Sequence, residues 1–169
     1  SMSTLVALHL AQVNPGRIAR TVLVTPPPPT GFGADDATLE SLRAIARGDD
    51  QLRLGALRAS QGTRLSVGWL KYKLARWRSC ASPEAVAAYA EMFARRGLPD
   101  PHSTVEVPVM AVTGEQDAEP MRSAAVTQFH GPLCPNLTVK AIVDSGHYPM
   151  QETPPLLVAV VERFLAGES

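Results

Sequence analysis

The sequence has few cysteines and aromatic residues, and it carries no excess charge of either sign. Its two cysteines, Cys80 and Cys134, do not form a CxxC pair, which argues against a disulfide scaffold and a structural zinc site. The 16 basic and 16 acidic residues cancel, so the general positive field that attracts nucleic acid is absent. We therefore expect neither a nucleic-acid partner nor a metal ion.

Long hydrophobic runs are absent as well, and none approaches the roughly 18 residues of a membrane span. The apolar stretch 5–11 is interrupted by His9 and has no basic leader, so we expect no signal peptide and a cytoplasmic location. What the chain does have is 169 residues, of which 45% are hydrophobic and 19% are charged. This composition suits one compact domain and excludes intrinsic disorder.

Short β-branched runs alternate with helical patterns along much of the chain. Strands are predicted at residues 20–25, 105–113 and 137–143, and helices at 4–12 and 154–166. This alternation is typical of the α/β class, with a mostly parallel sheet between flanking helices.

The region 31–104 has helical patterns only. They lie at residues 36–47, 65–77 and 83–96. Asp35 and Asp36 resemble a helix cap, and Ser82 precedes a proline and an acid as helix-capping serines do. A helical insertion between two strands predicts a cap or lid over a site. We therefore assign residues 1–30 and 105–169 to the α/β core.

Two titratable residues lie in the loops that follow predicted strands. His147 comes after the strand at 137–143, and Asp117 comes after the strand at 105–113. The carboxyl ends of such strands carry the active groups of open α/β sheets. A carboxylate bonded to an imidazole fixes its tautomer and requires a nucleophile elsewhere. Asp144 is a weaker candidate for the same partnership, and Glu152 is expected to interact with the N-terminus of the last helix.

The segment VDSGHYPMQETPP (143–155) and the opening SMSTLVALHLA together resemble the C-terminal part of a capped α/β-hydrolase. In that family a G-x-S-x-G elbow joins a strand to a helix, and the order is serine, acid, histidine. The opening is similar to the elbow helix counted from Ser1, although Ser3 replaces the second glycine. Small residues stand where that helix packs on its sheet: Ser3, Thr4, Ala7 and Ala11.

The resemblance implies hydrolysis of a carboxylic ester, lactone or thioester of a small-molecule acyl substrate, without a cofactor. Ser1 would attack the carbonyl, His147 would take its proton, Asp117 would orient His147, and the Met2 amide would donate to the oxyanion. The expected pocket aromatics are Phe32, Trp69, Trp77 and Tyr148.

The family's earlier strands have no counterpart in this chain, which predicts a sheet with an open edge. Three explanations remain. An N-terminal fragment of the same hydrolase completes the sheet, Ser1 is a cloning scar before Met2 of a truncated product, or a homodimer partner covers the edge. We favour the first, because the small residues keep register from Ser1.

Seven basic residues and no acid lie between Arg53 and Arg78, with Trp69, Leu70, Leu74 and Trp77 interleaved. We favour a core-facing stripe with a solvated basic back. The alternatives are a surface for an anionic partner, such as carrier-protein phosphopantetheine or an acidic substrate, and a helix on a membrane surface. An acyl-carrier thioesterase or acyltransferase is therefore the second hypothesis, and a non-catalytic hydrolase-like binding protein is the third.

Overall fold

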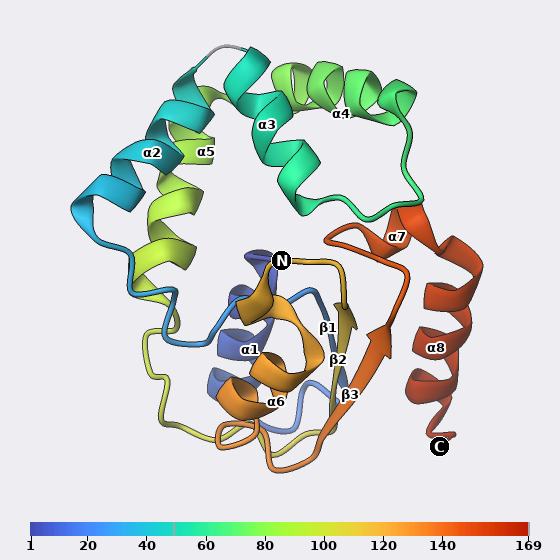
Figure 1. Cartoon of the computed structure of the whole chain (residues 1–169). Coiled ribbons are helices and arrows are strands. Elements are labelled where there is room, and N and C mark those ends of the chain that lie inside the picture. Colours follow the sequence, from blue (N-terminus) through green and yellow to red (C-terminus); the bar gives the residue numbers. More distant parts are fainter. Residues whose placement is uncertain (49, 169) are drawn as a thin grey trace.

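Three parallel strands form one sheet in the order β1–β2–β3 (Figure 1). The computed structural model describes residues 1–48 and 50–168. The strands are β1 (Thr21–Val24), β2 (Val109–Gly114) and β3 (Leu137–Ile142). Helices cover both faces of the sheet, so the predicted α/β class is confirmed.

The helices form two groups. One group flanks the sheet and consists of α1 (Ser3–Val13), α6 (Ser123–His130) and α8 (Pro154–Ala166), with the short turns η2 (Glu119–Met121) and α7 (Pro149–Glu152). The second group lies together beyond the carboxyl ends of the strands (Figure 1). We call it the helical insertion; it contains α2 (Asp36–Arg47), α3 (Asp50–Ser60), α4 (Val67–Cys80), α5 (Pro83–Glu91) and the π-helical turn η1 (Met92–Arg96).

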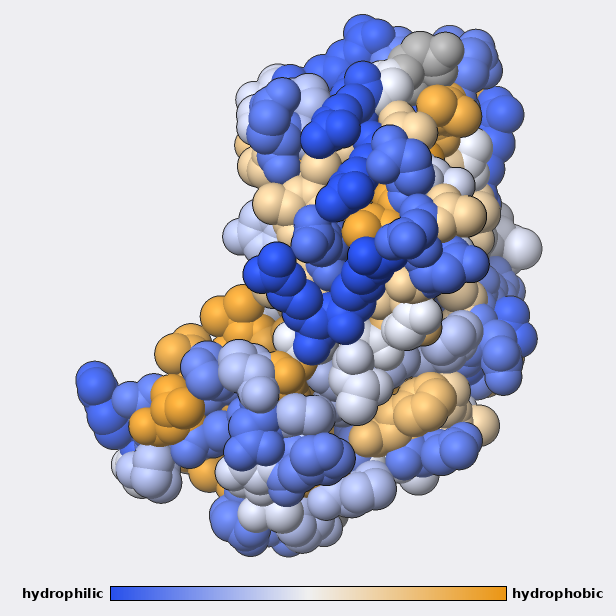
Figure 2. Space-filling view, turned by 90° about the vertical axis from the view of Figure 1, so that its left-hand side faces the viewer, coloured by the Kyte–Doolittle hydropathy of each residue, from blue (hydrophilic) through white to orange (hydrophobic). Residues whose placement is uncertain are grey.

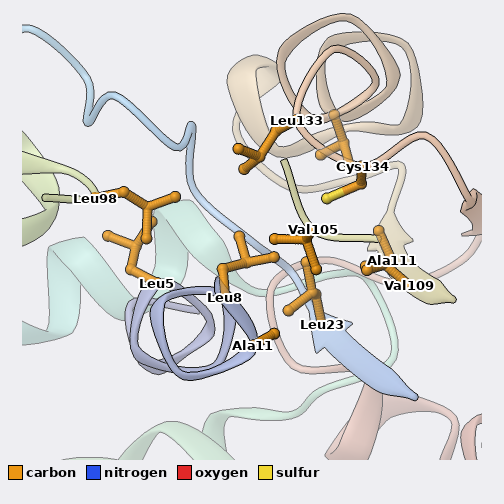
Figure 3. Packing of buried hydrophobic residues seen from close by; sticks show 11 residues of the cluster. Leu5, Leu8, Ala11, Leu23, Leu98, Val105, Val109, Ala111, Leu133 and Cys134 are labelled. Carbon is orange, nitrogen blue, oxygen red and sulfur yellow. The ribbon is translucent and has the colours of Figure 1, made fainter. Parts of the chain in front are cut away.

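Strand side chains alternate between two hydrophobic layers. On one face, Leu23, Val109 and Ala111 pack with α1 and α6 (Figure 3). On the other face, Met110 and Val112 pack against α8. Every residue of β2 is buried, as expected of the central strand of a sheet covered on both faces. The rigid β2 therefore fixes where the loop that follows it begins.

The strand expected to start at residue 105 starts at Val109 instead. Pro108 has no N–H for the ladder, although its carbonyl accepts a hydrogen bond from the Thr21 N–H at 3.0 Å. Before the proline, the Val105 N–H donates to the Leu133 carbonyl in a loop contact of 2.8 Å. The hydrophobic pattern of 105–108 thus reflects a loop anchored by the buried Val105 rather than a strand.

Two predicted helix caps are confirmed. The Asp35 carboxylate accepts from the Thr38 N–H at 2.8 Å, and the Ser82 hydroxyl accepts from the Ala85 N–H at 3.2 Å. The predicted helix 83–96 changes to π-helical winding at η1. Sequence patterns did not predict α3 or α6, because α3 contains a helix-disfavouring glycine and α6 is only 8 residues long.

Within residues 1–48 and 50–168, β1 and β3 each pair with β2 alone, so the β1 edge that was expected to be open has no partner strand. The neighbouring helix α1 exposes Val6, Leu10 and Val13. No helix formed by the described residues is both long and apolar enough to cross a membrane.

Candidate active site

Three chain segments meet at the carboxyl ends of the strands: the start of α1, the loop after β2 and the loop after β3 (Figure 1). Gly114 at the end of β2 is in register with Ile142 at the end of β3, so both loops leave the sheet side by side. The backbone nitrogen of Ser1 donates to the Val24 carbonyl at 2.5 Å, which holds Ser1 at the end of β1.

Asp117 and His147 are hydrogen-bonded at this edge. The Asp117 carboxylate is 2% exposed, and its Oδ2 lies 2.7 Å from Nδ1 of His147. Its Oδ1 accepts from the Ala118 N–H at 2.7 Å, so both oxygens have partners. The Arg122 guanidinium donates to the Asp117 carbonyl at 2.7 Å and steadies the loop. The His147 side chain is 16% exposed, so it is not sealed off from solvent.

Glu152 holds the backbone around His147. Its buried carboxylate accepts from the Gly146 N–H at 3.0 and 3.1 Å, and from the Tyr148 N–H at 3.2 Å. The expectation that Glu152 serves the last helix is wrong, because Glu152 ends α7 and α8 begins only at Pro154. A buried carboxylate that accepts from two N–H groups of a loop restricts that loop strongly.

Residues from distant segments also hold the histidine loop. The His147 N–H donates to the Ser60 carbonyl at 2.8 Å, and the Thr25 hydroxyl approaches the His147 carbonyl at 3.4 Å. Thr25 has a φ of 45°, which a β-branched residue rarely adopts, and its N–H bonds to the Val112 carbonyl at 2.8 Å. Backbone strain of this kind is found mostly at functional sites.

Gly62 and Gly146 allow the helical insertion to approach this loop, and Gly114 allows the loop to approach the end of β2. A Cβ added to Gly146 would lie 2.5 Å from the Gly62 nitrogen, and a Cβ on Gly114 would clash with the Gly146 carbonyl. The insertion also contacts the loops through the Thr63 N–H, which donates to the Gln116 side chain at 2.8 Å. The candidate site is therefore built at a contact between the core and the insertion that only glycine permits.

A cavity of about 240 Å³ opens beside these groups. Ser1, Met2, His147 and Tyr148 line it on the core side, and Trp77 lines it on the insertion side. Five of the predicted site residues therefore border one space. The Thr4 N–H donates to the Ser1 carbonyl at 2.8 Å, so α1 begins at this point. The Met2 N–H is one of the first N–H groups of the helix, which have no acceptor within it.

Trp69 and Phe32 lie outside the cavity lining. The Trp69 ring packs on Tyr148 with centroids 4.9 Å apart, and its Nε1–H donates to Gln151 at 3.0 Å, so it supports the wall from behind. The Phe32 ring meets Phe93 edge to face at 6.0 Å. Phe93 is the aromatic side chain that borders the cavity in that area.

Most of the remaining lining was not found by sequence reasoning. It comes from apolar side chains of α2, α3 and α5, namely Leu42, Ile45, Ala46, Ala56, Leu57, Val86 and Ala90. The available signal was the apolar face of the helices at 36–47 and 83–96. That signal indicates burial but does not distinguish packing against a neighbouring helix from lining a space.

Burial changes the acid–base properties of two groups near the sheet. Burial raises the pKa of Tyr148, despite its hydrogen bond with Ser60, so its hydroxyl stays protonated. Burial lowers the pKa of His130 to about 4, and its Nδ1 lies 3.2 Å from the Val126 carbonyl.

Across the described ranges, no three His, Cys, Asp or Glu side chains are grouped to hold a metal ion.

The basic stretch between Arg53 and Arg78 is partly neutralised. Arg53 is buried, donates to the Ala46 carbonyl at 2.8 Å and lies over the Trp77 ring. Arg64 pairs with Asp144 at 2.9 Å, and Arg78 pairs with Asp50. Asp144 therefore faces Arg64, and it is Asp117 that contacts His147.

A sequence model of the Alpha/beta hydrolase family matches residues 1–160. The chain belongs to this family. The comparison with curated proteins gives no significant match.

Solved structures of α/β-hydrolases superpose on the chain. An esterase from Exiguobacterium antarcticum has 15% identity and a TM-score of 0.80, covering 98% of this chain and 64% of its own. A bromoperoxidase from Bacillus anthracis has 18% identity and a TM-score of 0.77, and the superposition covers 95% of this chain and 63% of the bromoperoxidase. An enol-lactonase from Burkholderia xenovorans has 19% identity and a TM-score of 0.73, and the superposition covers 98% of this chain and 63% of the enol-lactonase. The chain thus spans just under two thirds of these proteins, and at such identities the likeness shows the fold.

Proposed function

We propose that this protein hydrolyses the carboxylic ester, lactone or thioester of a small apolar acyl group, with Ser1, His147 and Asp117 as the catalytic triad. One observation carries the proposal. The His147 imidazole is bonded at 2.7 Å to a buried carboxylate and borders the same cavity as Ser1. A nucleophile, a base and a group that orients the base are the parts that acyl transfer requires.

In this mechanism the Ser1 hydroxyl oxygen attacks the carbonyl carbon while the free nitrogen of His147 takes its proton. The protonated His147 then gives that proton to the leaving oxygen or sulfur as the acyl–leaving-group bond breaks. Water, activated by His147, releases the acid from Ser1. Asp117 stays ionised and stabilises the imidazolium, and the Met2 amide donates to the oxyanion, a contribution of about 3 kcal/mol.

The cavity supports an apolar acyl group. Its insertion side is lined by aliphatic and aromatic carbon atoms, and its volume of about 240 Å³ lies below the roughly 300 Å³ of the smallest pockets for drug-sized ligands. Ser60 and Tyr148 are the further polar side chains on its border. An acyl group that carries a charge would lose hydration here without gaining a counter-ion.

A serine-directed fluorophosphonate tests the triad, with intact-mass analysis and peptide mapping as the readout. We expect one label on Ser1, loss of labelling in His147→Ala, and normal labelling in the control Ser3→Ala. If the assembled protein takes no label, or if His147→Ala is labelled as fast as the original, the catalytic assignment is wrong and a non-catalytic binding protein is favoured.

We also propose that the open edge of β1 is covered by a partner, either an N-terminal fragment of the same hydrolase or a second copy of this chain. Support comes from the unpaired edge within the described residues, the exposed apolar residues of α1 and the coverage of the matched structures. Native mass spectrometry of the purified protein distinguishes the two partners. A stable species of one chain alone contradicts both.

We assign the protein to the cytoplasm. Cys80 is an exposed free thiol, and Cys134 is a buried one. Burial raises the pKa of Cys134 to about 11. Reducing compartments preserve exposed thiols of this kind. Labelling Cys80 with an alkylating reagent in freshly lysed cells tests its reduced state, and finding it oxidised contradicts the assignment.

A further inference from the structure

A second cavity, of about 350 Å³, adjoins the first one. Leu57, Trp77 and Tyr148 border both spaces. The second cavity differs in charge, because Lys73 and Arg76 of α4 line it and no acidic residue of the described chain does. Tyr148, which follows His147 directly, is thus the boundary between an apolar space and a cationic one.

Lys73 is held in an unusual position for a lysine. Its ammonium nitrogen lies 4.6 Å from the centre of the Tyr148 ring and 5.9 Å from that of Trp69. Burial lowers the pKa of Lys73, and no carboxylate offsets this effect. By contrast, Arg64 and Arg78 on the same stretch have acidic partners. In the described structure, therefore, a partly desolvated cation faces this cavity without a counter-ion.

We propose that this cationic cavity binds an anionic group, a carboxylate or a phosphate, on the leaving half of the substrate. The inference rests on the proposed function and narrows it to esters or thioesters with an apolar acyl group and an anionic alcohol or thiol. His147 protonates the leaving atom, so the leaving half emerges next to Tyr148, where Lys73 and Arg76 are within the same space. The apolar acyl cavity is the wrong place for that charge.

Two esters with the same hexanoyl group separate the charge from the rest of the molecule. One has 4-hydroxybenzoate as its alcohol half and the other has 4-hydroxybenzamide, which matches it in shape but is neutral. We expect the purified protein to have the higher kcat/KM on the benzoate ester. Lys73→Met should lower that value roughly 5- to 10-fold and leave the benzamide ester unchanged, since a partly exposed ion pair contributes about 1 kcal/mol.

Lys71→Met is the matched control, because Lys71 is an exposed cation on the same helix outside the cavity lining. It should leave both esters unchanged. Equal kcat/KM on the two esters, or an equal fall on both in Lys73→Met, overturns the proposal. A similar loss in Lys71→Met also overturns it, because the effect would then come from general surface charge.

Failure of the proposed function is distinguished by a binding measurement. Ligand-observed NMR with free 4-hydroxybenzoate and 4-hydroxybenzamide requires no turnover. If neither ester is hydrolysed but the benzoate binds in preference to the benzamide, and Lys73→Met removes the preference, the anion site holds and the hydrolase mechanism fails. If the protein binds the benzamide as well as the benzoate, the proposal of an anion site is wrong, whether or not the protein hydrolyses either ester.

Discussion

The core around the sheet and the helical insertion are built differently. β2 is buried along its entire length between two hydrophobic layers, whereas α4 buries only Leu70 among its 14 residues. On the face shown in Figure 2, the most hydrophilic residues lie on the upper part, over the insertion, and the largest hydrophobic patch lies at the left of the lower part. The core thus includes a strand that is buried along its whole length, whereas partly exposed ion pairs such as Arg43–Glu91 link helices of the insertion.

The two regions also contribute different parts of the candidate site. Ser1, Asp117 and His147 stand at the ends of core elements, where strands fix their backbones. The walls of both cavities come mainly from the insertion. We infer that the core determines whether a bond is hydrolysed, while the insertion determines which substrate is accepted. Substitutions that act on one role and spare the other test this division.

The largest expected effect comes from the core carboxylate. Asp117→Asn should lower kcat by about 10⁴-fold, because an amide favours the wrong histidine tautomer and does not stabilise the imidazolium. The control is Asp144→Asn, since Asp144 is also an acid after a strand but pairs with the exposed Arg64. Steady-state kinetics on a hexanoyl ester measures both. Comparable losses in the two variants would refute the role of Asp117.

A smaller effect concerns the stability of the core at low pH. His130 is buried at the end of α6, and burial lowers its pKa from 6.5 to about 4. The unfolded chain therefore binds a proton at His130 over this range while the folded chain does not. The contribution of His130 to the free energy of unfolding is therefore complete above pH 6.5. It falls by about 3 kcal/mol as the pH drops towards 4.

Urea unfolding at neutral pH and near pH 4.5, followed by circular dichroism, measures that loss. Carboxylates titrate in the same range, so the informative quantity is the difference between the original protein and His130→Asn. The variant should lose less stability between the two pH values. An identical loss would show that His130 is protonated as easily in the folded protein as in the unfolded chain.

The same division explains what sequence patterns predict in this protein. The strand predicted at 137–143 is rich in β-branched residues, and the prediction agrees with β3 to within one residue, although only Ile142 of β3 is buried. His147 and Asp117 were found because they lie in the loops at the carboxyl ends of strands. The strained backbone at Thr25 was not predicted, because its positive φ depends on tertiary contacts that leave no local sequence pattern.

The insertion was harder to predict, for physical reasons. Amphipathic helices reveal which face is apolar, but the arrangement of α2, α3 and α5 around a cavity depends on long-range packing. Trp69 and Phe32 were chosen as pocket aromatics, yet neither borders the space, whereas Phe93, which was not chosen, does. Glu152 was recognised as an acid near a helix start, but its hydrogen bonds to the histidine loop require the folded turn of α7.

The smallest expected effect changes selectivity without changing the chemistry. Ala90 on α5 is buried and borders the acyl cavity, so Ala90→Leu places additional carbon atoms where a longer acyl chain would lie. We expect kcat/KM for a hexanoyl ester to fall about tenfold relative to an acetyl ester, the lower end of what one methylene group is worth in an apolar pocket. The control Ala88→Leu changes an exposed position on the same helix and should leave the ratio unchanged. If Ala90→Leu lowers both esters equally, the substitution disturbs the His147 loop through the insertion, and the separation of chemistry from selectivity does not hold.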